Sequence, residues 1–171
     1  MHAYRYCPQC AALLEERVID GEPRRACSSS CGFVHYDNPT PVVAAVVEHE
    51  GLVLLARNRT WPEKMFGLIT GFLERDETPG QAVMREVKEE LNLDAGETRL
   101  IGVYSFQRMN QVIIAYHVVA NGSVQLNEEL VDYRRIPPEQ VRVWPAGTGF
   151  DALRDWLRSR GIEPEEMALP E

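Results

Sequence analysis

The hydrophobic positions of this chain are concentrated after residue 41. Residues 42–47 are uninterruptedly apolar and mostly β-branched, which predicts a strand buried on both faces. Residues 52–57, apolar up to the final Arg57, predict a second strand, and residues 48–51 between the two strands are polar and end in glycine, as in a turn. A third strand is expected near residues 66–72. The region therefore begins as a β-sheet.

A helix is predicted over residues 79–91. Thr78 offers a hydroxyl to the N-cap, and Pro79 suits the first helical position. Apolar residues recur at helical spacing and form one stripe that faces a core. These residues are Val83, Val87 and Leu91. Asn92 tolerates the left-handed conformation that ends many helices.

Strands and helices remain interspersed in the rest of the chain. Strands are expected at residues 98–106 and 112–119, and a short helical or turn segment at residues 136–141. An amphipathic helix is expected at residues 150–159, followed by a loose, acidic tail at residues 161–171. The pattern indicates a mixed α/β fold.

The chain of 171 residues is long enough for one medium domain with a small appendage. Residues 1–36 carry too few large apolar side chains to fold alone, so they form the appendage. Residues 37–160 form the main domain. Residues 37–41 contain two prolines and two turn-forming residues, which predicts a linker at its start.

The composition limits the partners of the protein. Its formal net charge of −8 gives no general attraction to nucleic acid or to anionic membranes. No apolar run approaches the roughly 20 residues that span a bilayer, and no secretory signal opens the sequence. A cytoplasmic location without membrane contact is therefore expected.

The four cysteines form two closely spaced pairs near the N-terminus. They are Cys7-x2-Cys10 and Cys27-x3-Cys31. Two such pairs can aim four thiolates at one point, which predicts a structural Zn²⁺ site of the zinc-ribbon type. Two disulfides or reactive thiols are the alternatives, and a reducing cytosol disfavours disulfides.

Three glutamates share one face of the predicted helix. Glu86, Glu89 and Glu90 stand at positions i, i+3 and i+4, so their carboxylates project together. Oxygen-rich clusters of this kind suit Mg²⁺ or Mn²⁺. The alternative is a solvated acidic face, which three glutamates alone would favour.

The surroundings of these glutamates favour the metal site. Residues 71–93 resemble the Nudix box, G-x5-E-x7-R-E-U-x-E-E-x-G-U, in which U is apolar. Eight of its nine positions are matched, by Gly71, Glu77, Arg85, Glu86, Val87, Glu89, Glu90 and Leu93. Asn92 replaces the second glycine, and both residues can adopt the positive φ of a helix C-cap.

The resemblance implies an α/β/α sandwich that hydrolyses a nucleoside diphosphate linked to a further moiety. It implies that the three helix glutamates bind the catalytic Mg²⁺ or Mn²⁺ and that Arg85 orients them through ion pairs. Glu77 is implied as a second structural or metal-associated acid. Gly71 is implied to permit a tight loop beside the bound phosphates.

Over residues 4–158 the chain also resembles the zinc-containing NADH pyrophosphatase group. The cysteine region and residues 36–39 precede the box as they do in that group. Glu129 falls where the group carries a further catalytic acid, with Glu128 as the alternative. A homodimer is expected from the resemblance alone.

One departure from the NADH pyrophosphatase group leaves the identity of the substrate undecided. Residues 104–111 lack the proline-rich stretch that follows the box in the NADH-cleaving enzymes. ADP-ribose, FAD, NAD(H) and NAD-capped RNA therefore all stay candidates, with AMP as the expected product from the free compounds. The rival class is a nucleotide-sensing or nucleic-acid-binding module, but the box retains every acid that catalysis needs.

Aromatic side chains are candidates for stacking on the substrate. They are Tyr36, Phe66, Tyr104 and Phe106, for each of which core packing is the alternative. Trp61 is expected to anchor a loop or contact substrate. Arg57 or Arg59 could meet phosphate, and a solvated surface position is equally expected for either.

Overall fold

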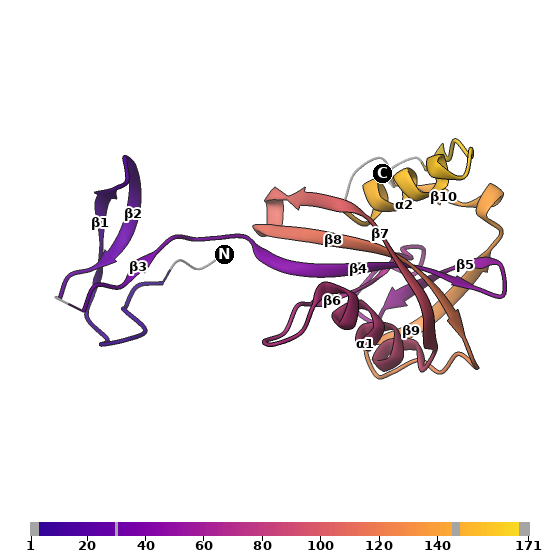
Figure 1. Cartoon of the computed structure of the whole chain (residues 1–171), viewed down its shortest axis with the longest axis horizontal. Coiled ribbons are helices and arrows are strands. Elements are labelled where there is room, and N and C mark those ends of the chain that lie inside the picture. Colours follow the sequence, from indigo (N-terminus) through magenta and orange to yellow (C-terminus); the bar gives the residue numbers. More distant parts are fainter. Residues whose placement is uncertain (1–3, 30, 145–147, 168–171) are drawn as a thin grey trace. The chain divides into compact units, whose positions relative to one another are not determined.

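The computed structural model describes residues 4–29, 31–144 and 148–167 (Figure 1). The chain divides into two compact units, Met1–Pro39 and Thr40–Glu171. The first corresponds to the cysteine region and the second to the expected α/β domain.

The first unit is a small antiparallel sheet. Its strands are β1 (Leu14–Ile19), β2 (Glu22–Cys27) and β3 (Val34–His35), in the order β1-β2-β3. Asp20 and Gly21 both have positive φ and join β1 to β2 in a two-residue turn, for which Asp-Gly is a favoured sequence. Among the described residues of this unit, the buried cluster comprises Cys7, Leu14 and Cys27, with Ala12 and Phe33 packed against it, which is too small a core to hold the unit by apolar burial alone.

The second unit is built on a six-stranded mixed sheet in the order β7-β8-β4-β5-β9, with β6 pairing with β4. The strands are β4 (Thr40–His49), β5 (Leu52–Asn58), β6 (Ile69–Phe72), β7 (Asp94–Phe106), β8 (Gln111–Asn121) and β9 (Leu130–Ile136). Strands β4 and β8 are parallel, and the other pairs are antiparallel.

The expected linker at residues 37–41 is shorter than predicted, because β4 already begins at Thr40 and includes Pro41. Proline is tolerated next to the first residue of a strand, where the missing N–H removes no required ladder bond. The carbonyl of Pro41 accepts a hydrogen bond from the Leu73 amide at 3.2 Å.

Helix α1 (Pro79–Leu91) has the predicted bounds and caps. The Thr78 side chain accepts a hydrogen bond from the Gln81 amide, and Asn92 ends the helix in the left-handed region at φ 57°. Helix α2 (Thr148–Ser159) begins two residues before the predicted start at residue 150. The remaining short elements are the 3₁₀ helices η1 (Gln107–Met109) and η2 (Pro138–Gln140) and the strands β10 (Arg142–Val143) and β11 (Glu165–Glu166). Strands β10 and β11 pair in parallel, so the described part of the expected loose tail holds a short strand.

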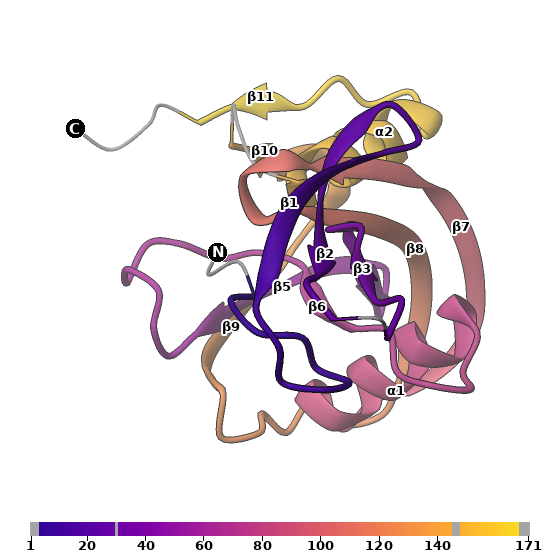
Figure 2. The same ribbon diagram turned by 90° about the vertical axis from the view of Figure 1, so that its left-hand side faces the viewer.

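Strand β4 divides the core of the second unit into two layers. Val42, Ala44 and Val46 belong to the cluster that includes α2, whereas alternate residues of β4 belong to the cluster that includes α1. Those alternate residues are Val43, Ala45 and Val47. Figures 1 and 2 show the two helices on opposite faces of the sheet. The predicted burial of this strand on both faces and the α/β/α sandwich are confirmed.

The two outer strands of the sheet are irregular or charged. Strand β7 has register shifts between Ala95 and Glu97 and between Leu100 and Gly102. Strand β9, which the sequence analysis did not predict, exposes five consecutive residues, Val131–Arg135, and buries only Leu130. Among the described residues, no helix is both long and apolar enough to cross a bilayer.

Candidate active site and cysteine cluster

Arg85 is the centre of a network of carboxylates on α1 and the preceding loop. Its guanidinium donates to Glu77 from Nε and Nη2 at 3.1 and 2.8 Å. Its Nη1 donates to Glu86 at 2.7 Å and to Glu89 at 3.1 Å, and its Nη2 also reaches the Phe72 carbonyl at 3.1 Å. The hydrogen bonds from Arg85 lower the pKa of Glu77, and those to Glu77 help raise the pKa of Arg85. Arg85 thereby ties the loop to the helix.

Gly71 is a strand residue, not part of a tight loop as expected. It lies in β6 opposite Val43, and a Cβ atom added to it would come within 1.9 Å of the Glu86 carboxyl group. Glycine is therefore required because the Glu86 side chain passes directly over the strand backbone. Burial raises the pKa of Glu86, whose side chain is 13% exposed.

Replacing Gly71 by alanine is expected to displace the Glu86 carboxylate and to lower the free energy of unfolding. The added methyl group overlaps Glu86, so the side chain or β6 must move, at a cost of roughly 1–3 kcal/mol. Urea denaturation and the activity assay described below measure the two effects. The matched control is Gly80→Ala, because a Cβ at Gly80 meets no atom within 4 Å. Equal behaviour of the two variants would contradict this account of Gly71.

Glu90 is the most buried acid of the group, with 8% of its surface exposed. Burial, together with the carboxylates of Glu86, Glu129 and Glu89, raises its pKa to about 8. No described residue donates a hydrogen bond to its carboxylate or pairs with it as a cation. A buried carboxyl group among other acids, with no protein cation of its own, fits the donor set that Mg²⁺ or Mn²⁺ requires.

The Glu128–Glu129 pair lies in the loop that leads into β9. This loop lies beside the end of α1, because the Asn127 amide donates to the Glu90 carbonyl at 3.2 Å, and the Glu129 carboxylate contributes to the raised pKa of Glu90. The Arg59 side chain is not available to bind phosphate, because it donates two hydrogen bonds to the Glu128 carbonyl. The sequence analysis did not find this contact, which joins residues 69 positions apart.

The substrate candidates are dispersed in the structure. Phe106 lines an apolar cavity of about 240 Å³ beside β6. Tyr104 instead donates to Asp155 at 2.8 Å, and burial raises its pKa. The Arg134 guanidinium lies over the Phe66 ring at 4.1 Å, and Tyr36 belongs to the first unit, where Arg24 lies over its ring.

The apolar cavity is also lined by residues that the sequence analysis missed. Thr70 borders it from the strand that carries Gly71, and successive strand residues point to opposite faces. Phe150 and Gln111 also line it, as does the predicted candidate Trp61, whose ring packs so closely on Gly67 that a Cβ there would lie 2.9 Å from it. The missed residues lie far apart in sequence and share no motif.

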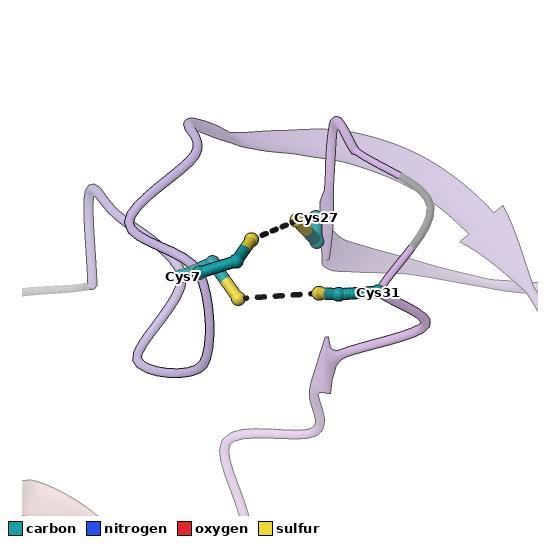
Figure 3. A group of neighbouring side chains, drawn as sticks. Cys7, Cys27 and Cys31 are labelled. Carbon is teal, nitrogen blue, oxygen red and sulfur yellow. Dashed lines mark hydrogen bonds between the residues drawn. The ribbon is translucent and has the colours of Figure 1, made fainter.

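The four cysteines gather at one point in the first unit. The Sγ atoms of Cys7 and Cys31 are 3.5 Å apart, those of Cys10 and Cys27 are 3.4 Å apart, and all four lie within 4.8 Å of one another. Figure 3 shows the labelled cysteine side chains directed toward a common centre. The Ser29 hydroxyl hydrogen-bonds the Cys10 thiol and contributes most to lowering its pKa, to about 6.

This geometry fits zinc and excludes the disulfide alternative in the structure. Tetrahedral Zn²⁺ with Zn–S bonds of about 2.3 Å separates its sulfurs by about 3.8 Å. A disulfide needs about 2.05 Å, and all four thiols are free. In the described part of the chain, this is the one group of three or more acids, histidines or cysteines whose ligand atoms are arranged to hold a metal ion. The carboxylate oxygens of the box glutamates lie less close together than the cysteine sulfurs, because Arg85 binds the carboxylates of Glu86 and Glu89.

Comparison with known proteins identifies both units of the chain. A family model described as the NUDIX domain matches residues 38–158, and a second, a zinc ribbon described as Nudix N-terminal, matches residues 5–37. The chain belongs to the Nudix hydrolase family and carries the family's N-terminal zinc-ribbon domain.

A solved NUDIX hydrolase from Nitrosomonas europaea is 27% identical, with a TM-score of 0.76 over 96% of this chain and 97% of that one. The NAD-capped RNA hydrolase NudC of Vibrio atlanticus (strain LGP32) is 30% identical over 66% of this chain and 40% of its own length. NudC of Stutzerimonas stutzeri (strain A1501) is 26% identical over 98% of this chain and 60% of its own length. The chain thus spans about half the length of these curated relatives.

Proposed function

We propose that this protein hydrolyses the pyrophosphate bond of an ADP-linked compound of the NAD(H), ADP-ribose or FAD type and releases AMP, with Mg²⁺ or Mn²⁺ as cofactor. The observation that carries the proposal is the position of Glu90. It is a buried carboxylate without a protein cation, and the acids of the Nudix box and Glu129 surround it. Such a site is costly to fold unless a divalent cation binds it.

Glu86, Glu89, Glu90 and Glu129 would hold the metal. When bound, a divalent cation neutralises pyrophosphate oxygens and lowers the pKa of a coordinated water. Arg85 orients Glu86 and Glu89 through its hydrogen bonds, and Glu77 anchors Arg85 from the other side. Glu90 must release the proton that its raised pKa retains at neutral pH, so metal binding and deprotonation are coupled.

The apolar cavity supports a nucleotide substrate. Its lining includes the aromatic side chains of Phe106, Trp61 and Phe150, on which a planar base could stack. Thr70, which also lines the cavity, lies in β6 next to Gly71. The relatives named NAD-capped RNA hydrolase favour an NAD-type linkage within the ADP-linked class.

The proposal is tested by incubating the purified protein with Mg²⁺ or Mn²⁺ and ADP-ribose, FAD, NADH or a diadenosine polyphosphate. AMP release is expected from at least one compound, and a Glu89→Gln variant provides the background rate. Release no greater than this background with every compound and metal would exclude the enzyme. Nucleotide binding retained without hydrolysis would favour a sensor module instead.

The second candidate substrate is NAD-capped RNA, which the names of both NudC relatives favour. Cleavage of the cap pyrophosphate would release nicotinamide mononucleotide and leave a 5′-monophosphate on the RNA. Comparing kcat/KM for free NAD and for a short capped RNA separates the two candidates. The strongly acidic composition favours the free dinucleotide.

Substituting Phe106 by alanine is expected to raise KM roughly tenfold with a smaller effect on kcat. Loss of one stacking surface removes about 1–3 kcal/mol of binding that ground state and transition state share. Tyr104→Phe is the matched control, since Tyr104 bonds Asp155 and does not line the cavity. Steady-state kinetics on the preferred substrate decide, and an unchanged KM in Phe106→Ala would remove Phe106 from the substrate site.

A further inference from the structure

We propose that Arg59 is a positioning residue that holds the Glu129 carboxylate beside Glu90. The inference deepens the proposed function, since it assumes that Glu129 is one of the metal-binding acids. It rests on a set of contacts that join the end of β5 to the loop before β9.

Three hydrogen bonds connect Arg59 to the loop. Its Nε and Nη2 atoms donate to the Glu128 carbonyl at 3.0 and 2.8 Å. Its backbone amide donates to the Glu129 carbonyl at 2.8 Å. The side chain and the backbone of Arg59 thus bind two consecutive carbonyl groups, which fixes the backbone conformation at Glu129.

Asn127 fixes the same loop from its other side. Its amide donates to the Glu90 carbonyl at the end of α1 at 3.2 Å. Its side-chain oxygen accepts from the Glu129 amide at 3.0 Å and from the Leu130 amide at 3.2 Å. The loop is therefore attached to the helix that carries the box glutamates and, through Arg59, to β5.

Electrostatics explains why the loop needs such an attachment. Glu129 follows Asn127 by two residues, and the Asn127 amide is bonded to the Glu90 carbonyl, so the Glu129 carboxylate lies at the end of α1 that carries the acids Glu86, Glu89 and Glu90. Without a restraint, repulsion among these carboxylates would turn the loop away from α1. A guanidinium on the Glu128 carbonyl opposes the movement with charge-assisted hydrogen bonds and leaves both loop carboxylates free.

The test measures Mn²⁺ binding to the substrate-free full-length protein by electron paramagnetic resonance, and hydrolysis separately. Arg59→Gln is expected to weaken Mn²⁺ binding about tenfold, the effect typical of a residue that orients metal ligands. In the hydrolysis assay kcat falls while KM changes little. Arg59→Lys recovers part of both losses, since an ammonium group can still donate to the carbonyl. The melting temperature stays nearly constant, because the contact is exposed.

Two further variants decide whether Arg59 acts through Glu129. In a Glu129→Gln background, Arg59→Gln is expected to add no further loss of Mn²⁺ affinity. The matched control is Arg135→Gln, which removes an exposed arginine paired with Glu50 and should leave Mn²⁺ binding unchanged. Additive losses, unchanged affinity in Arg59→Gln or a change confined to KM would overturn the proposal. Because Mn²⁺ binding needs no turnover, absence of hydrolysis would refute the proposed function and still leave this test valid.

Discussion

Replacing Glu90 by glutamine is expected to reduce hydrolysis by about 10³-fold, equivalent to about 4 kcal/mol of transition-state stabilisation. The amide keeps the shape of the side chain and removes the negative charge that would bind the metal. Because Glu90 is buried beside three other carboxylates, no neighbouring group is placed to substitute for it without moving. Single-turnover rates at saturating Mg²⁺ measure the loss.

The same substitution is expected to stabilise the protein in the absence of divalent cation, and increasingly so as the pH rises. The pKa of Glu90 is about 8 in the folded protein and 4.5 ordinarily. Between these values the folded state retains a proton that the unfolded state has lost, so the wild-type protein loses stability as pH increases. Glutamine removes this effect. The gain should be small at pH 4 and roughly 5 kcal/mol at pH 9, since each pKa unit corresponds to about 1.36 kcal/mol.

Glu89→Gln is the matched control for the effect on stability. The Glu89 side chain is 56% exposed and paired with Arg85, so its substitution should impair hydrolysis without the alkaline gain in stability. Urea denaturation at several pH values, in dialysed buffer rather than with a chelator that would extract zinc, measures the difference. A Glu90→Gln variant that is less stable than wild type at pH 9 would contradict the role of burial.

Removing the zinc, or substituting Cys7 by serine, is expected to unfold the first unit and leave the second folded. A structural zinc contributes about 10–16 kcal/mol in small domains, and the buried cluster of this unit, Cys7, Leu14 and Cys27, cannot replace it. The second unit has two apolar layers of its own. Elemental analysis should find about one zinc per chain in the wild-type protein.

The distribution of tryptophan makes this experiment specific. All three tryptophans, Trp61, Trp144 and Trp156, lie in the second unit, so their fluorescence reports on that unit alone. Limited proteolysis between residues 4 and 39 reports on the first. The control is Ser28→Ala, a neighbouring change that removes no thiolate. A protected first unit in the zinc-free protein, or simultaneous unfolding of both units, would refute the expectation.

Features that depend on local sequence were predictable. Helix α1 was found with correct ends because Thr78, Pro79 and Asn92 each act on the backbone next to them. The buried strands β4 and β5 were found because consecutive apolar residues can be accommodated only between two covering layers. The box glutamates were placed on one helix face by their local spacing, and their assignment to a metal site came from the resemblance to the Nudix box.

Features that depend on distant contacts were not predictable. Strand β9 has a mostly polar sequence, and it is a strand because it pairs with the edge of β5. The reason for glycine at position 71 is the Glu86 side chain, which reaches it only after α1 packs on the sheet. The contact of Arg59 with the Glu128 carbonyl likewise arises only when β5 and the loop before β9 meet.

The edges of the six-stranded sheet bear on how two copies of this chain could associate. Register shifts in the pairing of β7 with β8 bend the edge strand β7, and charged side chains, among them Asp132, Arg134 and Arg135, follow one another along β9. Neither edge offers the regular row of free amides and carbonyls that a strand of a second copy would need. The homodimer expected from the family resemblance would therefore be joined by side-chain surfaces, and growth of the sheet from one molecule into the next is disfavoured at both ends.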